Sequence, residues 1–407
     1  MSFATARKTF TSHQAASAFE AEVRDFCAFG AKTRFEEREG LPYYINEFWT
    51  AGQRQAHSIH EVSYRACFKP QLPRFFIDRL SGPGEAVYDP FMGRGTTPVE
   101  AALAGRTPVG NDVNPLSLLL TRPRLNPPAL PALPARLEEV PWGEGGIERE
   151  DLLVFYHRET LRQLSALRRF LMERAPLGAD PDPVDDWIRM VALNRLTGHS
   201  PGFFSVYTLP PNQAVSVEAQ RKINEKRAQT PPPRDVAKLI LRKSRALLAD
   251  GASPRAGARL GVGDAAATAF IASGSIKLVV TSPPFLDVVQ YESDNWLRSW
   301  FAGIDPAGVK ISALRSEEGW SAMVAAVLAE LARVLAPGGH VAFEVGEVKG
   351  GRLLLERLVW RAAEGLPFER LFVLVNAQRF TKTSHCWGVA NNGKGTNSNR
   401  IVLLRRR

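Results

Sequence analysis

From position 86 the chain reads Ala86-Val87-Tyr88-Asp89-Pro90-Phe91-Met92-Gly93-Arg94-Gly95-Thr96-Thr97, a short apolar strand followed by a turn that contains two glycines. Residues 98–104 continue as a helix, because a proline suits its first turn and Gly105 suits its end. Residues 107–110 form a second strand, and Asn111-Asp112 follows it. Strand, glycine turn, helix, strand and acid is the order of a nucleotide-binding half of a doubly wound sheet.

The glycine turn restricts which nucleotide it accepts. Glycines let the backbone approach a ligand, and an acid after the next strand can bind both ribose hydroxyls. A dinucleotide fingerprint needs a third glycine three residues after Gly95, where this chain has Pro98. The turn therefore favours a nucleoside with a compact, charged, phosphate-free tail, such as S-adenosylmethionine. Asp89 would face its ammonium group and Asp112 its ribose, although either acid also suits a helix cap or a turn.

A second informative turn lies in Val279-Val280-Thr281-Ser282-Pro283-Pro284-Phe285. The branched residues end a buried strand, and the prolines make a rigid turn with free carbonyls. Such a turn at the carboxyl end of a parallel strand is where α/β proteins place their chemistry. It would present the Ser282 hydroxyl, an outward carbonyl and the Phe285 ring, which together suit a planar group with an exocyclic amine. The alternative is an ordinary Pro-Pro loop.

The C-terminal part of the chain alternates strands with helices. A short strand at 260–263 ends at Asp264, which is placed to meet an adenine amine. Four further strands are predicted at 277–280, 340–345, 371–375 and 400–404, with helices at 323–335 and 350–363 between them. This alternation predicts an α/β fold, a doubly wound and mostly parallel sheet with helices on both faces.

Composition limits the remaining possibilities. The chain has 407 residues, of which 44% are hydrophobic, enough for two or three domains with a sizeable core. No run of eighteen apolar residues is present, and the three cysteines, Cys27, Cys67 and Cys386, are too widely spaced for a disulfide framework or a structural zinc site. We expect no metal and a reducing, cytoplasmic location. The net charge of +10 favours an anionic partner such as nucleic acid, or reflects only solubility.

Residues 126–255 interrupt the alternation with amphipathic helices, predicted at 151–174 and 184–196. The stretch from Arg221 to Arg245 contains nine basic residues and two acidic ones, and an aromatic loop at 198–207 precedes it. Basic helices beside aromatic residues suit phosphate contacts and base stacking, whereas any single cation is more simply explained as part of a solvated helix face. We therefore treat 126–255 as a helical insertion and a candidate DNA-recognition region.

The two turns together carry a resemblance to a known family. Asp-Pro-Phe-x-Gly-x-Gly-Thr-Thr at 89–97 and Thr-Ser-Pro-Pro-Phe at 281–285 resemble the amino-methyltransferases of DNA, which methylate cytosine N4 or adenine N6. Phe68-Lys69-Pro70 is similar to the family's cofactor-flanking motif, and Pro337-Gly338-Gly339 to its usual late turn. Adenine enzymes tend to have Asp or Asn where this chain has Ser282, so the motif resembles the cytosine-N4 branch.

The resemblance implies a seven-stranded, Rossmann-like methyltransferase sheet formed by 56–125 and 256–407, preceded by an N-terminal helical segment at 1–55. It implies S-adenosylmethionine as cofactor, and as partners a DNA duplex with a flipped base and a cognate restriction system. The implied catalytic residues are Ser282, Pro283, Pro284 and Phe285. The implied cofactor-binding residues are Lys69, Asp89, Phe91, Gly93, Gly95, Thr96, Asp112, Asp264 and Thr281. The position of the insertion, between the acids at 112 and 264, departs from the family's standard motif order.

Three functions remain open from the sequence. The first is methylation of cytosine N4 in DNA, and the second is methylation of adenine N6 or of an RNA base on the same sheet. The third is a binding module that has lost activity, which the intact motif set argues against. A carbon-5 cytosine enzyme would need a nucleophilic cysteine, typically after a proline, and none of the three cysteines follows one.

Overall fold

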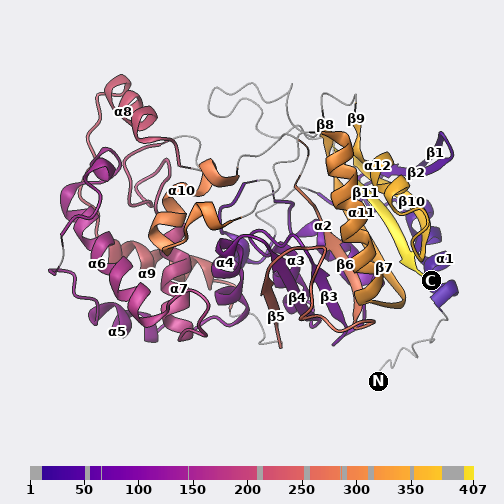
Figure 1. Ribbon diagram of the computed structural model, residues 1–407, viewed down its shortest axis with the longest axis horizontal. Helices are drawn as coiled ribbons and strands as arrows, with labels where there is room; N and C mark the ends of the chain where they lie inside the picture. The colour runs from indigo at the N-terminus through magenta and orange to yellow at the C-terminus, as the bar shows by residue number, and fades with distance from the viewer. Residues whose placement is uncertain are drawn as a thin grey trace.

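The computed structural model describes residues 12–50, 56–65, 67–144, 146–208, 214–251, 257–284, 286, 291–309, 316–348, 353–377 and 398–407. Its centre is one nine-stranded sheet with helices packed against both faces, and a group of helices lies at the β5 end of that sheet (Figure 1). The doubly wound α/β fold predicted from the strand and helix alternation is therefore confirmed.

The sheet has the strand order β1-β2-β10-β11-β7-β6-β3-β4-β5. Neighbours pair in parallel from β7 through β6, β3 and β4 to β5, whereas β11 is antiparallel to both β7 and β10. The strands span Arg34–Arg38 (β1), Leu41–Asn46 (β2), Ala86–Asp89 (β3), Thr107–Asp112 (β4), Arg259–Val262 (β5), Ile276–Thr281 (β6), Leu335–Val345 (β7), Phe368–Ala377 (β10) and Ser398–Arg406 (β11). The sheet is thus mostly parallel, as expected, but it has nine strands and not seven.

The two additional strands correct our expectation for the N-terminal segment. Among its described residues, 12–50, α1 (Ser12–Asp25) is the only helix; β1 and β2 form an antiparallel hairpin, and β2 pairs in parallel with β10. The aromatic residues Tyr43 and Tyr44 are both buried, on opposite faces of the extended sheet. Because aromatic side chains pack well on a pleated surface and β10 offers an open edge, this segment adopts strand structure.

Alternating residues of the central strands supply two apolar layers. On one side Leu278 and Val280 contact α1, α2 (Gln71–Leu80) and α3 (Thr96–Leu103). On the other side Val279 packs with α11 (Glu317–Val334) and α12 (Leu355–Ala362). Successive strand side chains point to opposite faces, which explains why one apolar run serves both layers.

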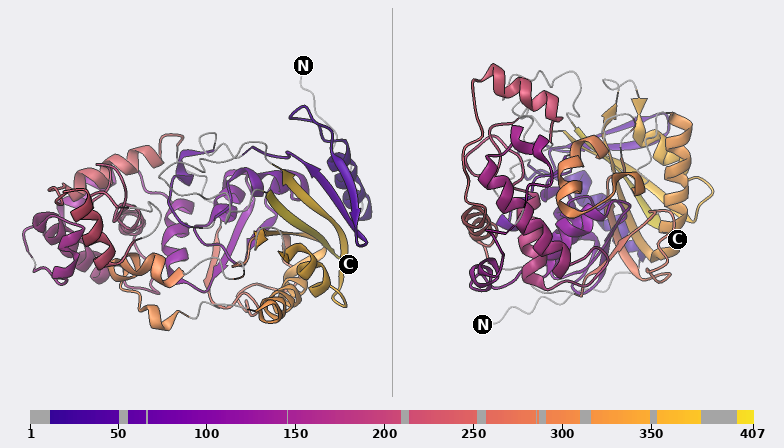
Figure 2. Two further views of the ribbon diagram at one scale, coloured as in Figure 1. Left: turned by 90° about the horizontal axis from the view of Figure 1, so that it is seen from above. Right: turned by 60° about the vertical axis from the view of Figure 1, so that its left-hand side comes forward.

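The helical insertion has its own apolar core, which it shares with two helices outside the predicted range. It contains α5 (Ala132–Glu138), α6 (Arg158–Arg174), α7 (Pro183–Leu193), α8 (Val217–Lys226) and α9 (Val236–Leu247). Buried residues of α4 (Pro115–Leu125) and α10 (Tyr291–Ala302) belong to the same core, so these helices join the insertion to the sheet (Figure 2).

The parallel register brings the predicted turns to one edge of the sheet. Asp89 pairs with Gly110 at the end of β3, and Asp112 pairs with Val262 at the end of β4. Thr281, the last residue of β6, lies at the same edge because β6 and β3 are parallel neighbours. Among the described helices, none combines the length and apolar character needed to cross a bilayer.

Candidate active site

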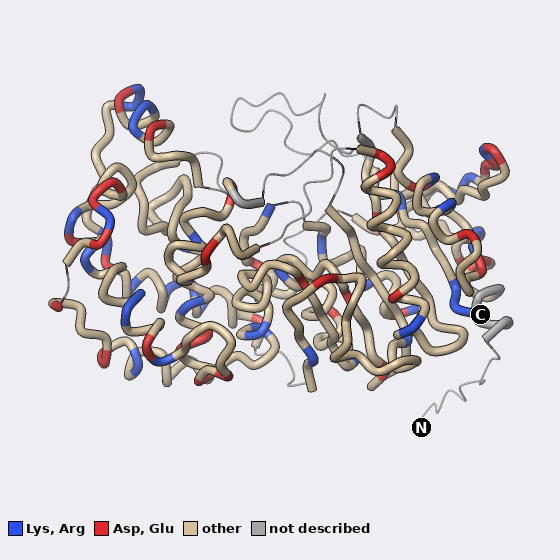
Figure 3. The backbone as a smooth tube through the Cα atoms, in the orientation of Figure 1, with Lys and Arg blue, Asp and Glu red and all other residues tan. Residues whose placement is uncertain are grey.

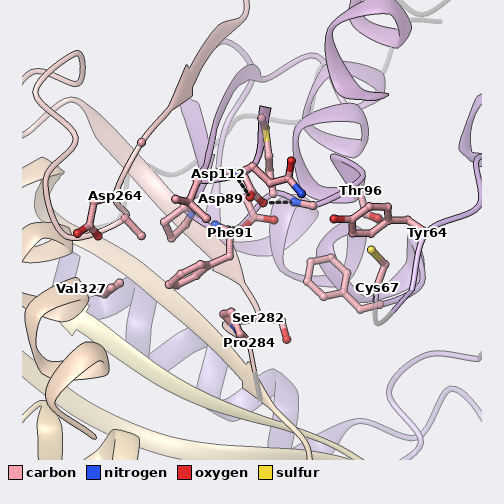
Figure 4. Close-up of a pocket in the computed structure, with 18 of the residues that line it drawn as sticks. Tyr64, Cys67, Asp89, Phe91, Thr96, Asp112, Asp264, Ser282, Pro284 and Val327 are labelled. Atoms are coloured by element: carbon pink, nitrogen blue, oxygen red, sulfur yellow. Dashed lines mark hydrogen bonds between the residues drawn. The ribbon is translucent and has the colours of Figure 1, made fainter. Parts of the chain in front are cut away.

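A pocket of about 300 Å³ opens at this carboxyl edge. Figure 4 shows Asp264 and Val327 at one end of it, Tyr64 and Cys67 at the other, and Asp89 and Asp112 facing Ser282 and Pro284 across it. Its wall is formed by Tyr64, Cys67, Phe68, Asp89, Pro90, Phe91, Met92, Gly93, Thr96, Asp112, Val113, Asn114, Gly263, Asp264, Ala265, Ser282, Pro284, Met323 and Val327. The turns after β3, β4, β5 and β6 therefore meet in one cavity.

Asp89 is a buried acid at the end of β3. Its Oδ1 accepts hydrogen bonds from Thr281 Oγ1 at 2.6 Å and from the Phe91 amide at 3.1 Å. Burial raises the pKa of Asp89 to about 7, and these hydrogen bonds oppose the shift only in part. Because Thr281 belongs to β6, the same contact fixes the glycine turn relative to the Ser-Pro-Pro turn.

Gly95 supports the glycine turn from behind the pocket wall. It has φ +74°, and a Cβ there would lie 2.3 Å from Oγ1 of Thr121 on α4. A side chain is therefore excluded both by the left-handed backbone and by contact with α4. Gly93, which lines the pocket with φ +49°, leaves the cavity side of the same turn free of a side chain.

Asp112 is held by backbone donors from two turns. Its Oδ2 accepts the Gly93 N–H at 2.8 Å and its Oδ1 accepts the Asn114 N–H at 2.9 Å. Burial raises the pKa of Asp112, while these hydrogen bonds favour its charged form. Each carboxylate oxygen can accept a further hydrogen bond, so both remain suited to a pair of ligand hydroxyls.

Asn111 joins three of the turns. Its carbonyl accepts the Met92 N–H at 2.9 Å, and its side-chain amide donates to the Gly263 carbonyl at 2.9 Å. Gly263 and the neighbouring Asp264 form the exposed end of the pocket, where Asp264 caps the next turn by accepting the Ala266 N–H. Asn111 thereby fixes the spacing between Asp112 and Asp264.

The Ser-Pro-Pro turn is anchored on both sides of Ser282. Before it, Thr97 Oγ1 donates to the Val280 carbonyl at 3.0 Å. After it, the indole N–H of Trp320, which is fully buried on α11, donates to the Pro284 carbonyl at 2.9 Å. These contacts set the position of Ser282 relative to the acids opposite.

The other end of the pocket is formed by Tyr64, Cys67 and Phe68. Arg94, the residue between the two glycines, is buried, and its guanidinium donates to the carbonyls of Val62 at 2.8 Å and Phe68 at 3.4 Å. Arg94 therefore binds this segment to the glycine turn. Burial raises the pKa of the Cys67 thiol, which keeps it protonated and a poor nucleophile.

The structure brings most, but not all, of the predicted site residues together. Those that line the pocket are Asp89, Phe91, Gly93, Thr96, Asp112, Asp264, Ser282 and Pro284. Four others do not line it: Lys69, Gly95, Thr281 and Pro283. Thr281 donates a hydrogen bond to the lining residue Asp89, and Gly95 lies against Thr121 of α4. The Lys69 carbonyl accepts the N–H of Leu72 in the first turn of α2. Phe285 lies outside the described residues.

Several lining residues were not predicted from the sequence. Tyr64 and Cys67 come from an irregular segment, and Met323 and Val327 come from α11. Tyr64 and Cys67 lie close in sequence to the Phe68-Lys69-Pro70 motif, which was a usable signal that they belong to the site. Nothing in the helical periodicity of α11 distinguishes its pocket residues from its core residues.

Comparison with known proteins assigns the N-terminal half of this site. Residues 15–118 match a family model described as DNA methylase, of the N6 and N4 methyltransferase type. The chain is 36% identical over 72 residues to the Type II methyltransferase M.MjaII of Methanocaldococcus jannaschii, covering 18% of this chain and 13% of that protein. It is 33% identical over 87 residues to the Type II methyltransferase M.MvaI of Kocuria varians, covering 21% and 19%. The chain thus spans less than a fifth of the length of either relative.

Solved structures align only loosely with this chain. The rRNA methyltransferase aviRa of Streptomyces viridochromogenes is 14% identical with a TM-score of 0.34, over 88% of this chain and 93% of that one. A candidate DNA modification methylase of Thermus thermophilus, complexed with S-adenosyl-L-methionine, is 21% identical with a TM-score of 0.23, over 36% and 54%. Scores this low support no conclusion about the present chain. By the family-model match and the two methyltransferase relatives, residues 15–118, which contain the glycine turn and Asp112, are similar to the DNA amino-methyltransferases.

Proposed function

We propose that this protein transfers a methyl group from S-adenosylmethionine to the exocyclic N4 amine of cytosine in DNA. The observation that carries the proposal is the shared pocket, in which Ser282 lies across from Asp89 and Asp112 (Figure 4). A cofactor-binding turn and an amine-binding turn can act together only if they open into the same cavity.

The donor set along the pocket suits this cofactor. Asp264 at one end would bind the adenine amine, Asp112 the ribose hydroxyls, and Asp89 the ammonium group. Met323 and Val327 give the Asp264 end an apolar wall for a flat base, and Gly93 leaves room near the middle. When bound, S-adenosylmethionine would supply an electrophilic methyl group on a sulfonium.

The Ser-Pro-Pro turn would activate the target amine. The lone pair of the cytosine amine is delocalised into its ring, so the nitrogen is a weak nucleophile. The Ser282 hydroxyl, which lines the pocket, would accept one of its hydrogens and favour a pyramidal nitrogen. The motif resemblance assigns the second hydrogen to the carbonyl of Pro283, between the lining residues Ser282 and Pro284, and the stacking on the base to Phe285. Acceptors placed where positive charge develops stabilise the transition state, as donors do in an oxyanion hole.

The base would have to leave the duplex to enter this pocket, which costs a few kcal/mol. A covalent carbon-5 mechanism is disfavoured, because burial raises the pKa of Cys67, the cysteine that lines the pocket. The alternative is transfer to adenine N6 or to an RNA base. Cytosine is favoured because Ser282 stands where adenine enzymes of this family tend to have Asp or Asn.

The test is incubation of the protein with methyl-labelled S-adenosylmethionine and defined DNA or RNA, followed by nucleoside analysis. The expected product is N4-methylcytosine from DNA. N6-methyladenine or a labelled ribonucleoside would replace the cytosine assignment with its alternative. An absence of labelled nucleoside from every substrate, with cofactor binding intact, would contradict the proposed activity.

A further inference from the structure

α8 is a surface helix that is attached to the protein by polar contacts on one side. Gln220, its one buried residue, donates from Nε2 to the Tyr207 carbonyl at 3.1 Å. Asn224, one turn later, donates from Nδ2 to the Val154 carbonyl at 2.7 Å. The helix buries little apolar surface beyond Val217, which packs against the core of the insertion, so these amides supply much of its attachment.

The exposed residues of α8 and its C-terminal end carry more basic than acidic side chains: four cations against Glu218 and Glu225, a net charge of +2. Arg221, Lys222 and Lys226 are exposed, as is Arg227 at the helix end, and none of the four forms an ion pair within the part of the chain that the structure describes. Glu218 and Glu225 lie on the same helix but are not within ion-pair distance of any of them. Lys222 and Lys226 repel each other at i, i+4 spacing, which opposes helix formation.

The nearby helix α6 differs. Its arginines 158, 162, 168 and 174 each have an acidic partner: Glu150 at 3.8 Å, Glu159 at 3.1 Å, Glu148 at 2.9 Å and Asp185 at 3.0 Å. Four of the five arginines of α6 are thus ion-paired, and the fifth, Arg169, donates to the Glu144 carbonyl. On α8 basic and acidic positions alternate along the helix, and its basic side chains form no ion pair among the described residues (Figure 3). An excess of cations without ion pairs attracts a polyanion and releases its counterions on binding.

The segment that leads into α8 is hydrogen-bonded to α10. The Ala214 N–H, just before the helix, donates to the Asp294 carbonyl at 3.3 Å, and Trp296 Nε1 donates to the Val215 carbonyl at 3.3 Å. Asp294 and Trp296 belong to the first turns of α10, the helix that follows the Ser-Pro-Pro turn. Figure 1 and the right view of Figure 2 show α8 on the side of the molecule toward which β8 (Glu347–Val348) also projects, beyond the carboxyl end of β7.

We propose that the exposed face of α8, formed by Arg221, Lys222, Lys226 and Arg227, binds the phosphate backbone of duplex DNA beside the flipped base. The inference rests on the proposed methylation of DNA and assigns a specific surface to its partner. Arg227 lies 3.8 Å from the centroid of the Tyr207 ring, which fixes one cation of the surface in place. Phosphate contacts of this kind set orientation and affinity but carry no sequence information.

The test compares two triple variants of the full chain that lose the same charge. One is Arg221→Gln/Lys222→Gln/Lys226→Gln, in which glutamine preserves helix propensity. The control, Arg74→Gln/Arg158→Gln/Arg162→Gln, removes three exposed cations that are already ion-paired. Binding of duplex DNA and of duplex RNA is measured over a range of salt concentrations, with cofactor affinity and thermal unfolding as checks on folding.

The α8 variant should bind duplex DNA at least tenfold more weakly, and its salt dependence should fall by about 2 to 3 in slope, near 0.9 per lost phosphate contact. The control should change both much less, and cofactor affinity should be unchanged in either. The proposed DNA-binding surface would be contradicted by an equal loss of DNA affinity in the two variants, or by an unchanged salt dependence in the α8 variant. A loss of affinity confined to duplex RNA would also contradict it. Because binding needs no turnover, a wild-type protein that binds DNA through α8 but methylates nothing would refute the proposed function and leave this surface standing.

Discussion

Asp89 lies between the two turns of the site, and its charge state should control cofactor binding. With its pKa raised to about 7 by burial, the residue is largely protonated below that pH in the free protein. An ammonium group needs the carboxylate, so affinity for S-adenosylmethionine should rise with pH up to about 7. It should decline again above about 8, where an α-amino group loses its proton. Calorimetric titration between pH 5.5 and 8.5 measures this dependence.

The matched variant for this prediction is Asp89→Asn, which keeps the shape and removes the charge. It should bind the cofactor more weakly and lose the rise below pH 7. A wild-type affinity that stays flat from pH 5.5 to 7.5 would show that Asp89 does not meet the ammonium group.

Ser282 and Asp112 should separate catalysis from cofactor binding. Ser282→Ala removes an acceptor from the target amine, so kcat should fall by about 100-fold or more while the cofactor Kd is unchanged. Asp112→Ala should instead weaken the cofactor, because Asp112 lies on the opposite side of the pocket (Figure 4). Single-turnover methylation and equilibrium binding distinguish these results. An unchanged rate for Ser282→Ala would remove Ser282 from the mechanism.

Trp320 should act on the reaction through the turn that it holds. Trp320→Phe keeps most of the buried ring but removes the hydrogen bond to the Pro284 carbonyl, worth about 1 kcal/mol. We expect kcat to fall by roughly tenfold, with the cofactor Kd unchanged, because the position of Ser282 is less well fixed. Steady-state kinetics and cofactor titration measure the two effects separately.

The chain offers a control for this variant in Trp142. Its indole N–H donates to the Leu137 carbonyl at 2.9 Å, far from the pocket. Trp142→Phe loses a hydrogen bond of the same kind from a partly buried ring, and it should keep full activity. If both variants lose activity in proportion to their stability, Trp320 has only a structural role.

At the scale of elements, the glycine turn and α3 depend on the fit between Gly95 and α4. Gly95→Ala should destabilise the fold by about 1–2 kcal/mol for the left-handed backbone, and by about 1–3 kcal/mol more for the overlap with Thr121. Gly105 ends the same helix with φ +71° and open space around it, so Gly105→Ala should show only the first cost. Chemical denaturation of both variants gives the difference.

The steric overlap between a Cβ at position 95 and Thr121 can be tested by shortening Thr121. Thr121→Ala in the Gly95→Ala background should recover part of the lost stability, because the Cβ at position 95 then meets a smaller neighbour. Equal losses for Gly95→Ala and Gly105→Ala would contradict the role of α4 in supporting the turn.

At the scale of the whole molecule, Arg65 joins the segment beside the pocket to α10, the helix that shares the apolar core of the insertion. Its guanidinium bonds both carboxylate oxygens of Asp294 on α10, at 3.0 and 2.7 Å, and Asp294 is buried. Arg65→Ala should lower the free energy of unfolding by about 1–3 kcal/mol, because a buried carboxylate loses a charged donor. It should also lower methylation, since α10 follows the Ser-Pro-Pro turn.

The comparison variant is Arg158→Ala, which breaks an exposed pair with Glu150. Pairs of this kind contribute little, so the unfolding free energy should change by less than about 0.5 kcal/mol. Both quantities come from urea denaturation followed by circular dichroism. If Arg65→Ala lowers the free energy of unfolding as little as Arg158→Ala does, the Arg65–Asp294 contact does not help to hold α10 in place.

Much of the sheet and half of the site follow from local sequence. Asp89, Asp112 and Asp264 each lie at the end of a short apolar strand or within two residues of it, and the carboxyl ends of parallel strands share one edge. Ser282 follows β6 for the same reason. Strand ends and turn residues are local features, so the order of residues along the chain is enough to place them.

Tertiary structure alone decided the rest. Met323 and Val327 line the pocket because α11 crosses the sheet beside it, and Tyr64 and Cys67 do so because buried Arg94 holds their segment against the glycine turn. Tyr43 and Tyr44 became part of β2 because β10 left an edge to pair with. These outcomes depend on which surfaces meet after the chain has folded, a property of packing between distant segments that no local pattern encodes.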